Sequence, residues 1–83
     1  MLDKDMTQSV RWFQRHRLEW IVETLYVFGA INRKHLCRKF GISTAQAALD
    51  FQTFRRLNPE LIAYDSSRRC YVAAGKLAEG DDA

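Results

Sequence analysis

Apolar residues recur with a helical period in the first third of the chain. One stripe, at positions i, i+3, i+4, i+7 and i+10, consists of Leu18, Ile21, Val22, Leu25 and Phe28. This spacing places side chains along one face of an α-helix. Thr7 or Ser9 can begin the helix, Trp12 and Phe13 extend its stripe, and Gly29 can end it. We therefore predict an amphipathic helix over residues 7–28.

Three further large apolar residues of this helix lie off the stripe: Trp20, Tyr26 and Val27. They either flank a small core or form a helix–helix contact between two copies of the chain. The second interpretation has weight because exposed aromatic side chains are otherwise unfavourable.

The next part of the chain has the pattern of two helices joined by a tight turn. Asn32 and Ser43 can cap helices over 33–40 and 44–57, since each side-chain oxygen can accept a hydrogen bond from an unpaired amide. Gly41 suits a turn that needs a positive φ. The pattern is typical of a helix-turn-helix, whose second helix enters the major groove of DNA. Short helix pairs with a glycine turn also occur as plain structure.

The second helix of this pair has two different faces. If Ala47 points inward, Phe51 and Phe54 do so too, at 100° per residue. An opposite face of amides, hydroxyls and a bare leucine suits a DNA groove, where Gln can bond adenine and apolar groups can contact thymine methyls. The alternative is a weakly amphipathic surface helix. The outward residues are Ala45, Gln46, Leu49, Gln52, Thr53 and Arg56.

Two β-prone runs around a short polar turn predict a hairpin over 61–72. The predicted pairing sets Asp65 opposite Arg68 and Tyr64 opposite Arg69. A hairpin directly after a recognition helix is a wing. Its tip would present both arginines to the phosphates or to the minor groove.

The charge of the 83-residue chain is mildly positive overall, +3 with a pI of about 9.1, but it is unevenly placed. Between residues 33 and 69, eight basic residues face three acidic ones, a local charge of +5. The surface is either a solvated basic face or a phosphate-binding face. The basic residues are Arg33, Lys34, Arg38, Lys39, Arg55, Arg56, Arg68 and Arg69.

Other site chemistry is not expected. Cys37 and Cys70 are predicted to be small buried apolar residues, and their spacing from His35 does not suit a metal. We expect no catalytic residue, no metal and no cofactor, so the protein is not expected to be an enzyme. No apolar run approaches the roughly 20 residues that span a membrane, and the N-terminus lacks an apolar signal core. These features predict a cytoplasmic, nucleoid-associated protein without a membrane partner.

The run INRKHLCRKFGISTAQAALDF, followed by NPELIAYDSSRRCYV, resembles the N-terminal winged-helix domain of bacterial WYL-domain transcriptional regulators. The branch in question is similar to repressors of anti-phage defence operons. The matching positions are Ile31-Asn32-Arg33, Phe40-Gly41-Ile42-Ser43, Gln46-Ala47, Asp50, Pro59, Tyr64-Asp65, Ser67 and Tyr71. Ala48 departs from the usual Ser, and His35 from an acidic residue. Family members continue into a ligand-sensing WYL domain and a dimerisation domain, so the resemblance implies a fragment or a small stand-alone protein.

We therefore predict a winged helix-turn-helix, mainly α with a small β-hairpin: three helices and a two- to three-stranded wing, with Ala30-Ile31 as a minimal third strand. The domain is expected over 7–73, between a flexible N-terminus at 1–6 and a linker or disordered tail at 74–83.

The predicted function is sequence-specific double-stranded DNA binding in transcriptional regulation. The resemblance implies a repressor of a phage-defence-like operon, a palindromic operator, and a homodimer formed through the first helix or through domains absent from this chain. The alternative is a protein–protein interaction winged helix that does not bind DNA directly. The residues predicted to contact DNA are Arg33, Lys34, Ser43, Thr44, Ala45, Gln46, Leu49, Thr53, Arg56, Arg68 and Arg69.

Overall fold

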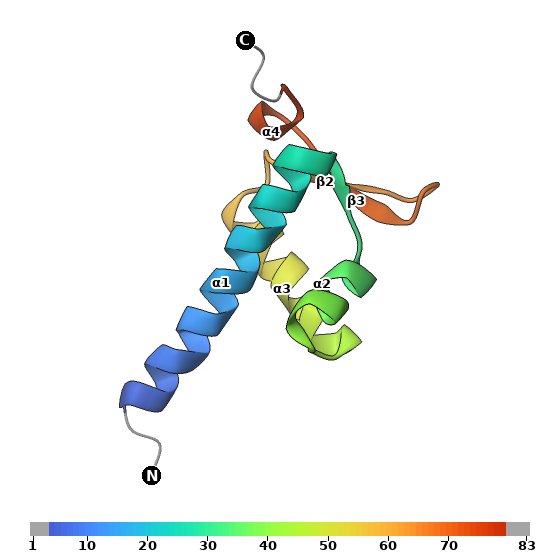
Figure 1. The fold of residues 1–83 in the computed structure, drawn as a ribbon. Helices are drawn as coiled ribbons and strands as arrows, with labels where there is room; N and C mark the ends of the chain where they lie inside the picture. The colour runs from blue at the N-terminus through green and yellow to red at the C-terminus, as the bar shows by residue number, and fades with distance from the viewer. Residues whose placement is uncertain (1–3, 80–83) are drawn as a thin grey trace.

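The computed structural model describes residues 4–79, and the side chains from Arg11 onward (Figure 1). Its elements confirm the predicted winged helix-turn-helix. A long first helix runs along one side of the body, the helix pair lies against it, and the hairpin projects from the opposite side (Figure 1). The elements are α1 (Lys4–Phe28), β1 (Ala30–Ile31), α2 (Arg33–Phe40), α3 (Thr44–Leu57), β2 (Ile62–Asp65), β3 (Cys70–Ala73) and α4 (Lys76–Glu79).

The helix pair has the predicted bounds because its predicted caps form. The Asn32 side chain accepts a hydrogen bond from the His35 amide at 3.1 Å, and His35 Nδ1 accepts from the Asn32 amide at 3.0 Å. Gly41 ends α2 with a φ of 65°, in the left-handed region. Ser43 Oγ then accepts from the Gln46 amide at 3.1 Å and begins α3. Both helices are thus held at their starts by local side chains.

The sheet contains the predicted third strand, but the predicted hairpin register is wrong. The strands are antiparallel in the order β1–β3–β2, and Asp65 pairs with Cys70 where we predicted Arg68. The turn has four residues because Asp65 Oδ1 accepts hydrogen bonds from the Ser67 amide, the Ser67 hydroxyl and the Arg68 amide. Since the error is two residues, each side chain keeps its predicted face of the sheet.

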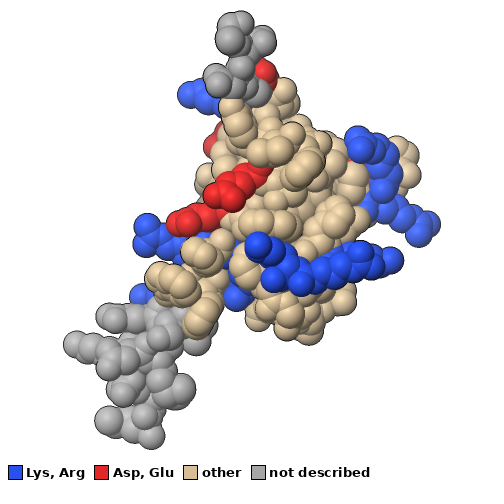
Figure 2. Space-filling view, in the orientation of Figure 1, with Lys and Arg blue, Asp and Glu red and all other residues tan. Residues whose placement is uncertain are grey.

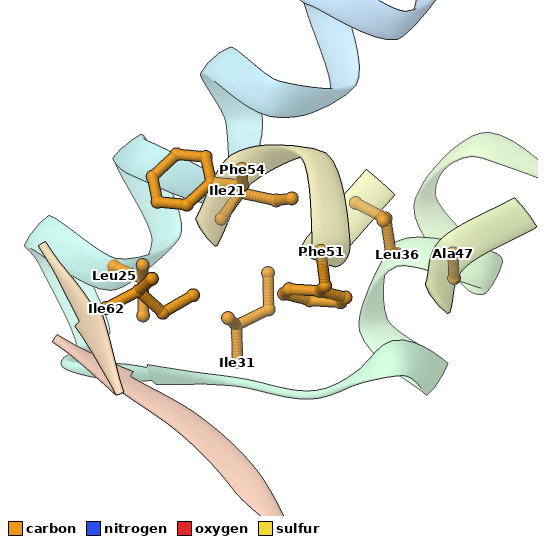
Figure 3. Close-up of a cluster of buried hydrophobic side chains, with 8 residues drawn as sticks. All are labelled: Ile21, Leu25, Ile31, Leu36, Ala47, Phe51, Phe54 and Ile62. Atoms are coloured by element: carbon orange, nitrogen blue, oxygen red, sulfur yellow. The ribbon is translucent and has the colours of Figure 1, made fainter. Parts of the chain in front are cut away.

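The core lies where α1, α3 and the sheet meet (Figure 3). Its two aromatic residues are Phe51 and Phe54, which confirms the predicted inward face of α3. Leu36 fills the angle between α2 and α3, with Phe40 and Ile42 half-buried around it. The cluster consists of Ile21, Leu25, Ile31, Leu36, Ala47, Phe51, Phe54 and Ile62.

The stripe on α1 is buried only at its centre. Ile21 and Leu25 are fully buried, but Phe28 is 78% exposed. At 100° per residue, Phe28 is rotated by about 80° from Leu18, so it lies at the edge of the stripe. The predicted extension through Trp12 and Phe13 is wrong too, since both are more than half exposed. There α1 projects beyond the elements that it packs against (Figure 1).

Both ends of the described chain differ from the predictions. The helix α1 already begins at Lys4, so residues 4–6 are helical where a flexible segment was predicted. No glycine or proline precedes Thr7 to prevent the helix from starting early. After Gly75, which has a φ of 56°, the helix α4 packs on α1 with Leu77 against the core. Residues 76–79 are therefore helical where a linker or disordered tail was predicted, and residues 1–3 and 80–83 lie outside the described part.

The residues off the α1 stripe have different positions. Trp20 packs edge-on against Phe40 with ring centroids 5.7 Å apart, which confirms that it flanks the core. Tyr26 and Val27 are 45% and 66% exposed.

Of the two free cysteines, Cys70 is buried as predicted, whereas Cys37 is only half-buried.

Candidate nucleic-acid interface

The starts of α2 and α3 and the tip of the wing surround one groove. Two pairs of cationic residues that are far apart in the sequence line it, one from α2 and one from the wing. The groove is lined by Asn32, Arg33, Lys34, Thr44, Arg68 and Arg69. The structure thus brings five of the residues predicted to contact DNA to one place.

The outward face of α3 continues from this groove. Thr44, Ala45 and Arg56 are exposed, and Leu49 is 54% exposed. Thr53 is half-buried. Because Thr53 and Arg56 belong to the second half of α3, they lie away from the residues that line the groove.

Two of the predicted contact residues have structural partners inside the protein. The Ser43 hydroxyl caps α3, so its oxygen is engaged with the Gln46 amide. The Gln46 side chain is half-buried and donates from Nε2 to Asp50 Oδ1 at 3.1 Å. Both residues therefore shape the first turn of α3 as well as its surface.

Asp50 is the polar centre of the helix packing, and the sequence analysis missed it. Its side chain is fully buried. Arg17 of α1 donates to it from Nε and, at 3.1 Å, from Nη2, and Gln14 of α1 donates at 3.4 Å. A buried carboxylate needs such partners, because an unpaired charge in the interior is very costly. Its place three residues after the inward Ala47 was the signal that could have revealed it.

The burial of Asp50 also changes the charge of the surface. Without it, eight basic residues between 33 and 69 face only Glu60 and Asp65, a net charge of +6. Figure 2 shows Lys and Arg over α2 and around the wing, whereas Asp and Glu lie along α1. This face is basic over α2 and around the wing, whereas acidic and basic side chains lie side by side along α1, where Arg15 pairs with Glu19 at 3.5 Å.

The basic residues do not all belong to the groove. Arg38 and Lys39, at the end of α2, line a separate pocket that also contains Trp20 and Phe28 from α1. The Lys39 ammonium lies 6.0 Å from the centre of the Trp20 ring. This pair of cations therefore faces the α1 side of the domain.

The wing tip has a defined conformation. Hydrogen bonds from the Ser67 hydroxyl and from the amides of Arg68 and Ser67 lower the pKa of the Asp65 carboxyl below its ordinary value of 3.8. Arg69 has a φ of 54°, which only glycine adopts without steric cost. The turn therefore places a non-glycine residue at a conformational cost, and both Arg68 and Arg69 are exposed there.

Among the side chains of residues 11–79, no cluster of three or more His, Cys, Asp and Glu is arranged to hold a metal ion. Over residues 4–79, no helix is both long and apolar enough to cross a membrane. The polar residues that line the groove offer hydrogen bonds and positive charge.

Comparison with known proteins agrees with this geometry. The sequence model of the BrxR transcriptional regulator winged helix-turn-helix domain matches residues 14–79. The chain belongs to this family. It is a family of transcriptional regulator domains and not of enzymes, and the match confirms the resemblance to the N-terminal domain of WYL-domain regulators.

The chain is also similar to part of several longer proteins that are named as transcriptional repressors. The chain is 45% identical over 64 residues to the DNA-binding transcriptional repressor CapW of Escherichia coli, covering 77% of this chain and 21% of the repressor. It is 42% identical over 66 residues to the CapW repressor of Pseudomonas aeruginosa, covering 80% of this chain and 22% of that protein. The chain thus spans about a fifth of the length of these relatives.

Proposed function

We propose that this BrxR-type domain binds duplex DNA sequence-specifically and thereby represses transcription. The observation that carries the proposal is the groove lined by Arg33 and Lys34 of α2, by Arg68 and Arg69 of the wing, and by Thr44 at the start of α3. A duplex carries one negative charge per about 1.7 Å of its axis, so paired cations on both sides of a helix start suit its backbone. The names of the repressor relatives support the same function.

In this proposal α3 enters the major groove with its first turns. Thr44, Ala45, Gln46 and Leu49 face the base edges, since recognition helices contact bases mainly with their N-terminal residues. Their amide, hydroxyl and apolar groups match the donors, acceptors and thymine methyls of that groove. Thr53 and Arg56, in the second half of α3, contact the DNA backbone in this proposal.

The cations of α2 and the wing position the domain on the backbone. Arg33 and Lys34 contact phosphates on one side of α3, and Ser43 contributes its hydroxyl proton there. Arg68 and Arg69 contact phosphates or the adjacent minor groove on the other side. Such contacts set the register of the helix on the duplex and supply most of the non-specific affinity.

The biological setting is a finer proposal that rests on the family resemblance. The target is a palindromic operator of a phage-defence-like operon, and the protein acts in the cytoplasm, associated with the nucleoid. A two-fold operator needs two copies of the domain, joined through α1 or through domains beyond this chain. The exposed Tyr26, Val27 and Phe28 at the end of α1 support the first route.

A charge-matched pair of variants tests the proposal. Replacing Arg68 and Arg69 with Ala should weaken binding to a random duplex, because two phosphate contacts are lost. The control replaces Arg11 and Arg15 with Ala, which removes the same charge from exposed positions on α1, outside the groove. Both should be measured by fluorescence anisotropy at the same salt concentration. Equal weakening by the two pairs would show that only the net charge matters, and would contradict the groove assignment.

A further inference from the structure

The recognition helix contains a carboxylate that holds one of its own outward side chains. Asp50 is fully buried, and Gln46 lies one turn before it on α3. Gln46 Nε2 donates to Asp50 Oδ1 at 3.1 Å. Gln46 is half-buried, so its amide lies between the buried carboxylate and the outer face of the helix.

The chemistry of this contact fixes which way the Gln46 amide is turned. A carboxylate without its proton only accepts hydrogen bonds, so the NH₂ group must face Asp50 and the Oε1 must face away. The reverse orientation would set two acceptors against each other. Among the described side chains, those of residues 11–79, Asp50 is the one hydrogen-bond partner of the Gln46 side chain. Oε1 and the second N–H of Gln46 remain for a ligand.

The carboxylate is itself held from α1. Arg17 donates to both of its oxygens, and the Arg17 side chain is only 12% exposed. The Arg17 guanidinium is therefore occupied inside the protein and is not available as a phosphate contact. It neutralises the charge of Asp50. It also fixes the orientation of the carboxylate, since a guanidinium binds both carboxylate oxygens through a planar fork of donors.

We propose that Asp50 is a positioning residue for base readout, acting through Gln46. It presents the Gln46 amide with one N–H and Oε1 outward, the donor–acceptor pair that matches N7 and N6 of adenine in the major groove. Cytosine offers an amino group there without the adjacent acceptor, so adenine fits better. The inference rests on the proposed function, in which α3 enters the major groove. Because the amide is held before DNA arrives, less side-chain freedom is lost on binding.

A binding selection from a random duplex library tests this role. The wild type should enrich adenine at one position, and Gln46→Ala should reduce that enrichment by roughly 5- to 150-fold, the range for loss of a bidentate pair. Asp50→Asn should reduce enrichment at the same position. The double variant Asp50→Asn with Gln46→Ala should do no more there than Gln46→Ala alone.

Folding must be separated from readout, because Asp50→Asn leaves the Arg17 charge without its partner. The paired variant Arg17→Met with Asp50→Leu removes both charges, and replacing a buried ion pair by apolar residues often leaves stability intact. It should melt like the wild type and bind random duplex equally well, yet lose the adenine preference. The matched control is Gln14→Ala, which removes another donor to Asp50 and should keep the preference.

The outcomes distinguish this inference from the proposed function. If the wild type binds duplex but the folded Arg17→Met, Asp50→Leu protein enriches the same base equally, Asp50 does not position Gln46 and the inference is overturned. If the wild type binds no duplex at all, the proposed function fails first.

NMR on the free wild-type protein tests the inference without any variant. The side-chain amide protons of Gln46 should exchange more slowly than those of the exposed Gln52. Equal exchange would overturn the inference even if every Asp50 variant unfolds.

Discussion

The ring of Phe51 lies flat on the ring of Tyr71, with centroids 4.2 Å apart and planes 7° from parallel. Phe51 belongs to α3 and Tyr71 to β3, the central strand of the sheet. Tyr71 in turn contacts Tyr64 of β2 edge-on, with centroids 5.0 Å apart. These contacts attach the wing to α3, so the distance from α3 to the arginines at the wing tip is set by packing.

The stacking of Phe51 on Tyr71 should contribute measurably to the free energy of unfolding. Tyr71→Leu keeps an apolar side chain but removes the ring, and should lower the free energy of unfolding by about 0.5–1.5 kcal/mol, the usual contribution of an aromatic pair. Thermal or urea unfolding followed by circular dichroism measures it. Tyr64→Leu serves as the control, since Tyr64 is 43% exposed and touches Tyr71 only edge-on. An equal or larger effect of the control would contradict the account.

Two phenylalanines of the helix pair should respond differently to truncation. Phe54 is 1% exposed, so Phe54→Ala should cost about 3–5 kcal/mol, enough to unfold much of a small domain. Phe40 is half-buried against Trp20, and Phe40→Ala should cost less. Chemical denaturation gives both values. If Phe40→Ala is the more damaging change, the core has been placed on the wrong side of α2.

The strained wing residue separates stability from binding. Arg69→Gly removes the steric cost of a positive φ and should raise the free energy of unfolding, by about 1 kcal/mol. The same change removes a guanidinium and should weaken binding to random duplex. Arg68→Gly is the matched control, since it should weaken binding without stabilising the fold. The idea fails if Arg69→Gly destabilises the domain in thermal melts.

The hairpin turn should weaken in acid. Because hydrogen bonds lower the pKa of Asp65 in the folded protein below 3.8, the ionised carboxyl stabilises the folded state. This contribution is fully present above the unfolded pKa and is lost as the pH falls through the lower, folded pKa. NMR titration of the carboxyl should find its midpoint below 3.8, and Asp65→Asn should remove this part of the pH dependence. A midpoint above 3.8 would contradict the turn geometry.

Local signals explain why much of the fold was predictable. Asn32, Gly41 and Ser43 determine the ends of their helices through contacts within a few residues, so α2 and α3 were predicted to the residue. The inward face of α3 followed from the helical period around Ala47. These features depend little on the rest of the molecule.

One feature that was not predicted is local, the wing turn, whereas the surroundings of Phe28 and Asp50 depend on residues far away in the sequence. The four-residue wing turn arises from Asp65 accepting three hydrogen bonds, while residue preferences alone favoured a two-residue turn. Phe28 was predicted to be a core residue because the helical period of apolar residues does not show where along the helix another element packs against it. Asp50 looked like a surface acid, because only the packing of α1 brings Arg17 to it.

The candidate site shows the same division. The basic pairs at 33–34 and 68–69 could be identified from the sequence, but only the fold brings them to one groove. The role of Gln46 as a partner of Asp50 needed the structure as well.

The central claim is that this groove binds the phosphate backbone, and the salt dependence of binding tests it most directly. Affinity for a random duplex should be measured by fluorescence anisotropy over a series of salt concentrations. The logarithm of the binding constant should fall linearly with the logarithm of the salt concentration, by about 0.9 for each neutralised phosphate. The variant with Arg68→Ala and Arg69→Ala should show a slope smaller by about one for each lost contact. A flat salt response, or no binding even at low salt, would contradict the claim.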